Sequence, residues 1–142
     1  MSTPTLAPLV NTYKALAHPA RLRILAMLRG GELCVCQLNA VIGVAASTIS
    51  AHLAALREAG LVAERKAGRW VHYRLASEGA AEATLATLWL VLQKDPQIAD
   101  DGRVLERVTA LPVEAICRPD FDAAALREVC CPTATEKRKT CA

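Results

Sequence analysis

The sequence has no uninterrupted apolar run close to the roughly 20 residues that a membrane-spanning helix requires. Hydrophobic residues nevertheless make up 53% of its 142 positions. The first residues are polar and include proline, so they lack the basic and then apolar pattern of a secretory signal. These absences argue against a membrane partner and predict a cytoplasmic protein. The apolar content also argues against global disorder and suits one compact domain with an extension.

The familiar motifs of catalysis are absent as well. There is no glycine-rich phosphate loop, no nucleophile elbow and no Cys-x-x-Cys pair. The isolated dipeptide Gly30-Gly31 indicates the end of a helix. The histidines His18, His52 and His72 are too far apart to suggest a metal cluster. We therefore expect a protein that is not an enzyme and has no catalytic cofactor.

The net charge of +3 is distributed unevenly along the chain. Residues 1–94 carry ten Lys or Arg and five Asp or Glu, a net charge of +5. Residues 95–142 carry seven and nine, a net charge of −2. Because basic side chains neutralise phosphates, the first part of the chain suits a nucleic-acid partner.

Apolar residues at helical spacing predict four helices in the first sixty residues. These helices span residues 6–16, 21–29, 36–42 and 47–59. His18-Pro19 separates the first two, because proline fits the first turn of a helix and not its interior. The last two are joined by a short turn that contains Gly43, and together they match a helix-turn-helix.

Two strands are predicted next, at residues 61–66 and 70–75, joined by a turn that contains Gly68. The hairpin has a basic tip, and beside a helix-turn-helix it forms a wing. Residues 78–93 then predict a helix that is apolar on almost every side, so it needs cover on more than one face. We expect a homodimer formed by this helix and the first one. The predicted fold is mainly α with a small β-hairpin: a homodimeric winged helix-turn-helix.

The predicted recognition helix and wing supply the candidate DNA contacts. Exposed side chains of the helix can reach base edges or phosphates in the major groove, and basic wing residues can hold phosphate. The candidates on the helix are Ser47, Thr48, Ser50 and His52. The candidates on the wing are Arg65, Lys66 and Arg69.

Asp95-Pro96 marks a boundary in the sequence. Beyond it, short helices are predicted at residues 103–111 and 122–131, and the end of the chain from residue 132 is expected to be flexible. We therefore divide the chain into a DNA-binding and dimerisation domain, residues 1–94, and a cysteine-containing extension, residues 95–142.

Cys34 and Cys36 are the most informative residues of the sequence, because they lie at the start of the predicted helix-turn-helix, about ten residues before its DNA-reading helix. Thiolates are good ligands for a soft metal or metalloid. Residues two apart point in different directions on a helix but share one side of an extended segment. We therefore place the pair at the junction before the third helix. Chelation there is expected to unwind the first turn of that helix and so disturb the recognition helix.

Several stretches of the sequence resemble the ArsR/SmtB family of winged-helix metalloregulatory repressors, above all its arsenic-responsive members. The resemblance covers about residues 10–92. It rests on Leu16-Ala17, Arg21-Leu22, Glu32-Leu33-Cys34-Val35-Cys36, Leu38, Ile49-Ser50, His52-Leu53, Leu56-Arg57-Glu58, Gly60-Leu61, Arg65-Lys66, Gly68 and Trp70-Val71-His72-Tyr73-Arg74-Leu75. It implies a homodimer that binds a palindromic double-stranded operator and is released when cysteine thiolates chelate As(III) or Sb(III).

The third thiolate of such a site is left open by this sequence. Some relatives carry a cysteine three residues after the second one, but position 39 here is Asn. The extension offers further thiols, from the same chain or from its partner. Cys130 and Cys131 are the first candidates, and Cys117 and Cys141 are weaker ones. Thiolate ligands would also suit Cd(II) or Pb(II).

Two alternative functions remain. In one, the protein is a repressor of the same fold that senses oxidation of its thiols. In the other, it no longer binds DNA and only traps metalloid.

Overall fold

The computed structural model describes residues 6–76 and 79–130 of the chain. As predicted, it is mainly helical with a small antiparallel sheet. The helices are α1 (Leu6–Leu16), α2 (Pro19–Leu28), α3 (Val35–Ile42), α4 (Ala46–Glu58), α5 (Ala80–Leu92), α6 (Pro96–Thr109), α7 (Val113–Ile116) and α8 (Ala123–Cys130). The strands are β1 (Leu33–Cys34), β2 (Val62–Ala67) and β3 (Trp70–Leu75).

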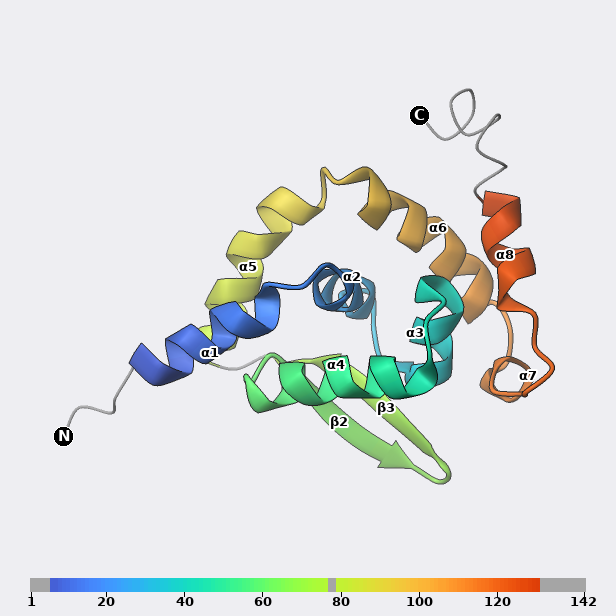
Figure 1. The fold of residues 1–142 in the computed structure, drawn as a ribbon, viewed down its shortest axis with the longest axis horizontal. Coiled ribbons are helices and arrows are strands. Elements are labelled where there is room, and N and C mark those ends of the chain that lie inside the picture. The colour runs from blue at the N-terminus through green and yellow to red at the C-terminus, as the bar shows by residue number, and fades with distance from the viewer. Residues whose placement is uncertain (1–5, 77–78, 131–142) are drawn as a thin grey trace.

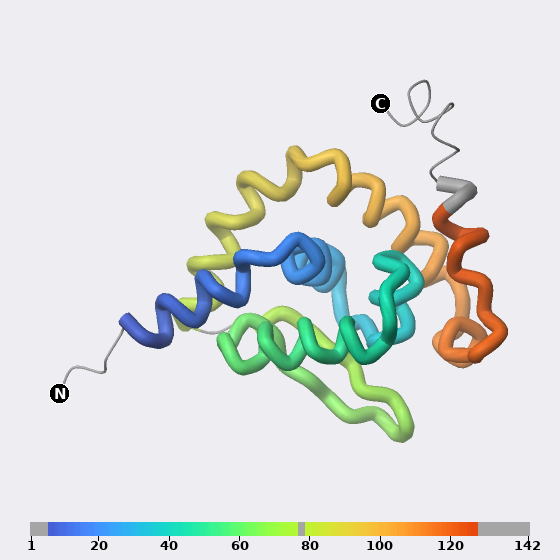
Figure 2. The backbone as a smooth tube through the Cα atoms, viewed as in Figure 1, coloured from blue at the N-terminus to red at the C-terminus, as the bar shows by residue number. Residues whose placement is uncertain are grey.

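Helix α2 lies at the centre of the molecule (Figure 1). Helices α5 and α6 arch over it on one side, and α4 with the β2–β3 hairpin lies on the other (Figure 2). Helices α7 and α8 lie beside α3, at the opposite end from α1. None of the described helices is by itself long and apolar enough to cross a membrane; α3 and α4 meet that test only together, as a pair bent by 113°.

The start of α2 differs from the prediction by two residues and has a clear cause. Pro19 occupies the first helical position, and the Nδ1 atom of His18 accepts a hydrogen bond of 3.1 Å from the backbone N–H of Ala20. A side-chain cap of this kind satisfies a backbone N–H that has no partner within the helix. The helix therefore begins at the proline, and the histidine acts as its cap.

Helices α3 and α4 form the predicted helix-turn-helix. Gly43 ends α3 with a left-handed φ of 78°, a conformation that glycine adopts without strain. In the turn, the backbone N–H of Val44 donates a hydrogen bond of 3.0 Å to Oδ1 of Asn39. The side chains of Ile49, Leu53 and Leu56 point inward from α4 and are fully buried, which fixes the opposite face of α4 outward.

The sheet has three strands in the order β1-β3-β2, so the expectation of a two-stranded hairpin was incomplete. The predicted hairpin is present, with Val62 opposite Leu75 and Ala67 opposite Trp70. The additional strand β1 pairs with β3 and consists of only Leu33 and Cys34. Two residues are too few to produce the alternating pattern that reveals a strand in a sequence.

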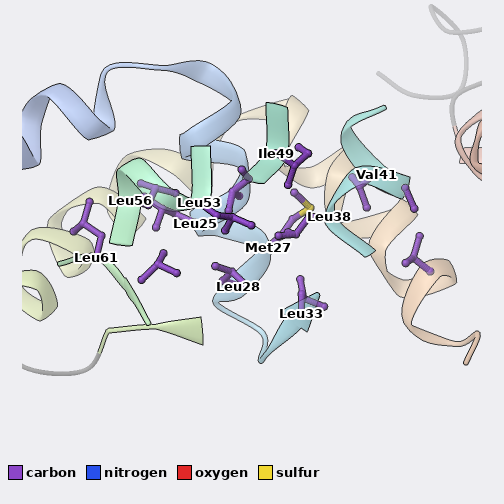
Figure 3. Close-up of a cluster of buried hydrophobic side chains, with 14 of the residues drawn as sticks. Leu25, Met27, Leu28, Leu33, Leu38, Val41, Ile49, Leu53, Leu56 and Leu61 are labelled. Carbon is purple, nitrogen blue, oxygen red and sulfur yellow. The ribbon is translucent and has the colours of Figure 1, made fainter. Parts of the chain in front are cut away.

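The hydrophobic core joins α2, α3 and α4 (Figure 3). Figure 3 shows Leu25 and Met27 of α2 close to Leu38 of α3 and Leu53 of α4. Leu25, Leu38 and Leu53 are fully buried. Helix α3 is therefore packed into the same core as the recognition helix, so a movement of one is felt by the other.

The chain after Asp95 contains more helix than predicted. Helix α6 begins at Pro96 instead of residue 103, because Asp95 caps it: its Oδ1 accepts a hydrogen bond of 2.8 Å from the N–H of Gln97. The short helix α7 was not predicted, and α8 agrees with the prediction. Helix α6 packs against α2 and α3, and α8 packs against α3 and α6. The division at residue 95 stays a prediction, and the end of the chain lies outside the described residues.

Candidate thiol centre and nucleic-acid interface

Cys34 lies at the junction between β1 and α3, where the sequence placed it. Its backbone is extended, it is paired with His72 of β3, and the residue is only 3% exposed. Its N–H donates a hydrogen bond of 2.9 Å to Oε1 of Gln37, one turn into α3. The first turn of α3 is therefore tied to the sheet through the residue expected to bind a metalloid.

Cys36 is held differently, because it lies in the first turn of α3 and forms a disulfide with Cys117. The Cα atoms of the two residues are 5.3 Å apart, and 81 positions separate them in sequence. Cys117 directly follows α7, so the disulfide ties α7 to α3. The sequence named Cys117 only as a weaker ligand candidate, and no local pattern indicates its pairing with Cys36.

A cavity of about 520 Å³ opens beside this disulfide, between α3 and the α7–α8 segment. Both cysteines line it, together with Asn39, Arg118 and Arg127, whereas Cys34 does not. The expectation that Cys34 and Cys36 share one side is therefore not met in this structure, because α3 already begins at Val35.

The remaining sulfur ligands proposed from the sequence are not placed. Cys131 and Cys141 lie outside the described residues, and so does the side chain of Cys130. Within the described part of the chain, no group of three or more His, Cys, Asp or Glu side chains is close enough to hold a metal ion. Among the described cysteines, Cys36 and Cys117 are therefore joined in a disulfide, and Cys34 is a buried free thiol.

Arg127 connects the same segment to the helix-turn-helix, and sequence reasoning missed it. Its Nη1 atom donates a hydrogen bond of 2.8 Å to the backbone carbonyl of Ala40, in the last turn of α3. Its guanidinium also lies against Gly43, where an added Cβ would approach it to 3.0 Å. A cation at a helix C-terminus is favourable, so Arg127 stabilises the turn that leads into α4.

The predicted DNA-reading residues of α4 fall into two groups. Ser47, Thr48 and Ser50 are exposed on the first turns of the helix. His52 is half-buried; its Nδ1 accepts a hydrogen bond of 3.2 Å from Nε of Arg21, and its ring lies 4.4 Å from that of His18. Burial lowers the pKa of His52, and the neighbouring His18 and Arg21 lower it further. This histidine is positioned by α2 more than it is presented to solvent.

The wing residues are exposed, but one of them is already paired. Lys66 and Arg69 are exposed, and the Arg69 guanidinium lies 5.9 Å from the centre of the Trp70 ring. Arg65 is exposed as well, and its Nη2 and Nε atoms donate hydrogen bonds of 2.8 and 3.1 Å to Oε2 of Glu32. This hydrogen bond from Arg65 lowers the pKa of Glu32. The wing is therefore linked to the loop that precedes β1.

Two helices at the other end of the molecule expose large apolar side chains. Leu6 and Tyr13 of α1 are 76% and 61% exposed, and Leu90 and Val91 of α5 are 64% and 70% exposed. Several large apolar side chains exposed to solvent on one helix are typical of an interaction surface.

The family model described as "Bacterial regulatory protein, arsR family" matches residues 18–64. The arsenical resistance operon repressor of Escherichia coli is 48% identical over 68 residues, which cover 47% of this chain and 58% of that protein. The chain thus spans little more than half the length of this relative.

A second relative is matched over nearly its whole length. The arsenic resistance transcriptional regulator ArsR2 of Pseudomonas putida is 34% identical over 110 residues, covering 75% of this chain and 95% of that protein. This chain belongs to the ArsR family.

A solved member of the fold agrees with this assignment. The homodimeric winged helix-turn-helix DNA-binding domain Mb0332 of Mycobacterium bovis, described as a possible ArsR-family regulator, is 32% identical. The match covers 66% of this chain and 92% of that one, with a TM-score of 0.56. The family resemblance and the winged helix-turn-helix predicted from the sequence are therefore confirmed. The individual DNA and metalloid contacts stay predictions.

Proposed function

We propose that this ArsR-family chain is a metalloid-responsive transcriptional repressor. It binds double-stranded, palindromic operator DNA as a homodimer and is released when cysteine thiolates chelate As(III) or Sb(III). The observation that carries the proposal is the packing of α3 and α4 in one core. Leu38 of the cysteine-bearing helix α3 lies in the same buried cluster as Ile49 and Leu53 of the DNA-reading helix α4. A movement of the thiols on α3 can therefore be passed through this core to the DNA contacts on α4.

The DNA-binding part of the proposal is supported by exposure and charge. Ser47, Thr48 and Ser50 face solvent on α4 and would meet base edges in the major groove. Lys66 and Arg69 face solvent on the wing and would hold phosphate, with Arg65 joining them when it leaves Glu32. His52 would support the helix from behind through Arg21.

The dimer is supported by the exposed apolar side chains of α1 and α5. A second copy would cover Leu6, Tyr13, Leu90 and Val91 and place two recognition helices on one operator. The same symmetry in the DNA would make the operator palindromic. A cytoplasmic location, expected from the sequence, stays a prediction.

The chemistry of the available donors fits a soft, thiophilic inducer. Cys34 and Cys36 lie at the start of α3, and thiolates select such ions over Mg²⁺ or Ca²⁺. Chelation would bend the first turn of α3 away from its present geometry. A coupling of about 1–3 kcal/mol would weaken operator binding about 5- to 150-fold.

One titration tests this function. As(III) is added to the reduced protein bound to its own promoter fragment, and fluorescence anisotropy follows the DNA. We expect release of the wild type and no release of the variant Cys34→Ser/Cys36→Ser. Absence of DNA binding at low salt would contradict the repressor and favour a metalloid trap.

A second function is favoured by the disulfide between Cys36 and Cys117. A repressor that senses oxidation would form this bond in response to an oxidant and leave its DNA without metalloid. Release by diamide alone, with no response to As(III), would support this alternative.

A further inference from the structure

Cys36 has one described thiol neighbour on its cavity, and that neighbour comes from the far end of the chain. On α3, a second ligand on the same face would have to lie three or four residues later, where the chain has Asn39 and Ala40. Asn39 is committed to the turn through its hydrogen bond to Val44. Cys34 is buried against the sheet and does not line the cavity.

We propose that Cys117 is the thiol that chelates the metalloid together with Cys36, so that the inducer bridges α3 and α7. The proposal rests on the function proposed above and names the residue that fills the place left open at position 39. Cys34 then becomes a secondary ligand, reached only after the first turn of α3 opens.

The positions of the two residues suit a shared ligand. Their Cα atoms are 5.3 Å apart, within the range of about 4.4–6.8 Å at which two cysteine side chains meet without backbone movement. A metal–sulfur bond is about 2.3 Å long for zinc, so rotation about the Cα–Cβ bonds can make room for one bridging atom. The cavity of about 520 Å³ gives the ligand access to both sulfurs.

The reaction balances without a change in oxidation state of arsenic. Each reduced thiol gives its proton to one hydroxide of arsenous acid, two water molecules leave, and two arsenic–sulfur bonds form. The disulfide must first be opened by a two-electron reductant such as a phosphine. The pair can therefore hold a disulfide bond or a metalloid, but not both.

Bridging would also act on the DNA-reading part. Cys36 lies in the first turn of α3, and Arg127 of the same C-terminal segment holds the last turn through Ala40. A ligand between α7 and α3 would thus pull one end of α3 while Arg127 holds the other. Because only one end of α3 would move, the helix would tilt relative to α4.

Peptide-resolved alkylation tests the bridge directly. Trypsin releases residues 108–127 as one peptide, because the bond after Arg118 precedes proline, and Cys117 is its sole cysteine. Reduced protein with and without As(III) is treated with iodoacetamide. We expect As(III) to slow alkylation of Cys117 at least tenfold in the wild type and in Cys34→Ser, but not in Cys36→Ser. Equal rates with and without As(III), or protection that persists in Cys36→Ser, would overturn the proposal.

Release from DNA gives the second measurement. The variant Cys117→Ser should require at least tenfold more As(III) for release than the wild type, whereas Ala115→Ser, which introduces a serine on α7 two residues before Cys117, should behave as the wild type. Wild-type release that is unchanged in Cys117→Ser would overturn this proposal and leave the repressor function standing. Failure of the wild type to respond to As(III) would overturn both.

Discussion

Arg23 and Asp101 form a two-pronged ion pair that ties α2 to α6 across 78 positions of sequence. Both hydrogen bonds are 2.8 Å long, and the Asp101 side chain is only 4% exposed. Gln97 donates a third hydrogen bond, of 3.0 Å, to the same carboxylate. The hydrogen bonds from Arg23 to Asp101 raise the pKa of Arg23. It anchors the helix after residue 95 to the centre of the domain.

Asp101→Asn should destabilise the fold by about 2–3 kcal/mol, because it leaves a guanidinium without its counter-charge. This is less than a fully buried pair would lose, since Arg23 is 24% exposed. Urea unfolding of the reduced protein measures the change. Asp120→Asn is the matched control: its pair with Arg118 is exposed, so the change should stay within about 1 kcal/mol. Equal effects of the two variants would contradict the role given to Asp101.

Glu32→Gln should strengthen binding to operator DNA, because it removes a negative charge and releases Arg65 for phosphate. The slope of log affinity against log salt should become steeper by about one unit. The measurement is anisotropy over a range of salt concentrations. Glu82→Gln makes the same charge change on the exposed surface of α5 and should leave the slope unchanged. A similar gain in both variants would mean that net charge alone is responsible.

The lowered pKa of His52 predicts that the folded protein loses stability in mild acid. Its pKa in the folded protein lies below the ordinary value of 6.5, chiefly because burial disfavours the charged ring. As the pH falls through 6.5, the unfolded chain takes up a proton that the folded chain does not, so stability declines until the folded pKa is passed. Urea unfolding between pH 7.5 and 5 should show this decline in the wild type. It should be shallower in His52→Gln, and parallel curves would refute the assignment.

Oxidation should block the response to metalloid. Diamide accepts the two electrons and two protons of the Cys36 and Cys117 thiols, and the resulting disulfide leaves neither sulfur free. After removal of diamide, As(III) should no longer release the oxidised protein from DNA, and a phosphine reductant should restore release. Release of the oxidised protein at the same As(III) concentration as the reduced one would contradict the prediction. Loss of DNA binding on oxidation alone would instead favour the oxidation sensor.

Reduction of the same disulfide should lower the free energy of unfolding by about 2–4 kcal/mol, because a crosslink over a long loop restricts the unfolded chain. Urea unfolding with and without a phosphine reductant measures the difference. In Cys117→Ser the reductant should have little effect. If the reductant does not change the stability of the wild type, the crosslink does not restrict the unfolded chain and the prediction is wrong.

Local patterns predicted the DNA-reading part of the fold well. Helical spacing, glycine stops and the alternation after Trp70 placed α1 to α4 and the hairpin within two residues of their observed ends. The family resemblance followed from the same stretches. The buried positions of Ile49, Leu53 and Leu56 also followed from their spacing along one helix face.

Contacts between distant residues could not be predicted in this way. The Cys36–Cys117 disulfide spans 81 positions, and the bond from Arg127 to Ala40 spans 87. The spacing of these residues does not predict their contacts, because the contacts depend on how α6 packs against α2. Strand β1 was missed because a two-residue strand has no period. The pair of Glu32 with Arg65 was missed because Arg65 lies on β2, 33 positions later in the sequence.

The disulfide also turns part of the polypeptide into a closed ring. That ring contains α4, both wing strands, α5 and α6, while α1 and α2 lie outside it. A protease that cuts once at the exposed tip near Arg69 would open the oxidised ring without separating two fragments. The same nick in reduced protein would yield two pieces under denaturing conditions. Electrophoresis with and without reductant therefore reports on the state of the thiol pair without any DNA or metalloid in the sample.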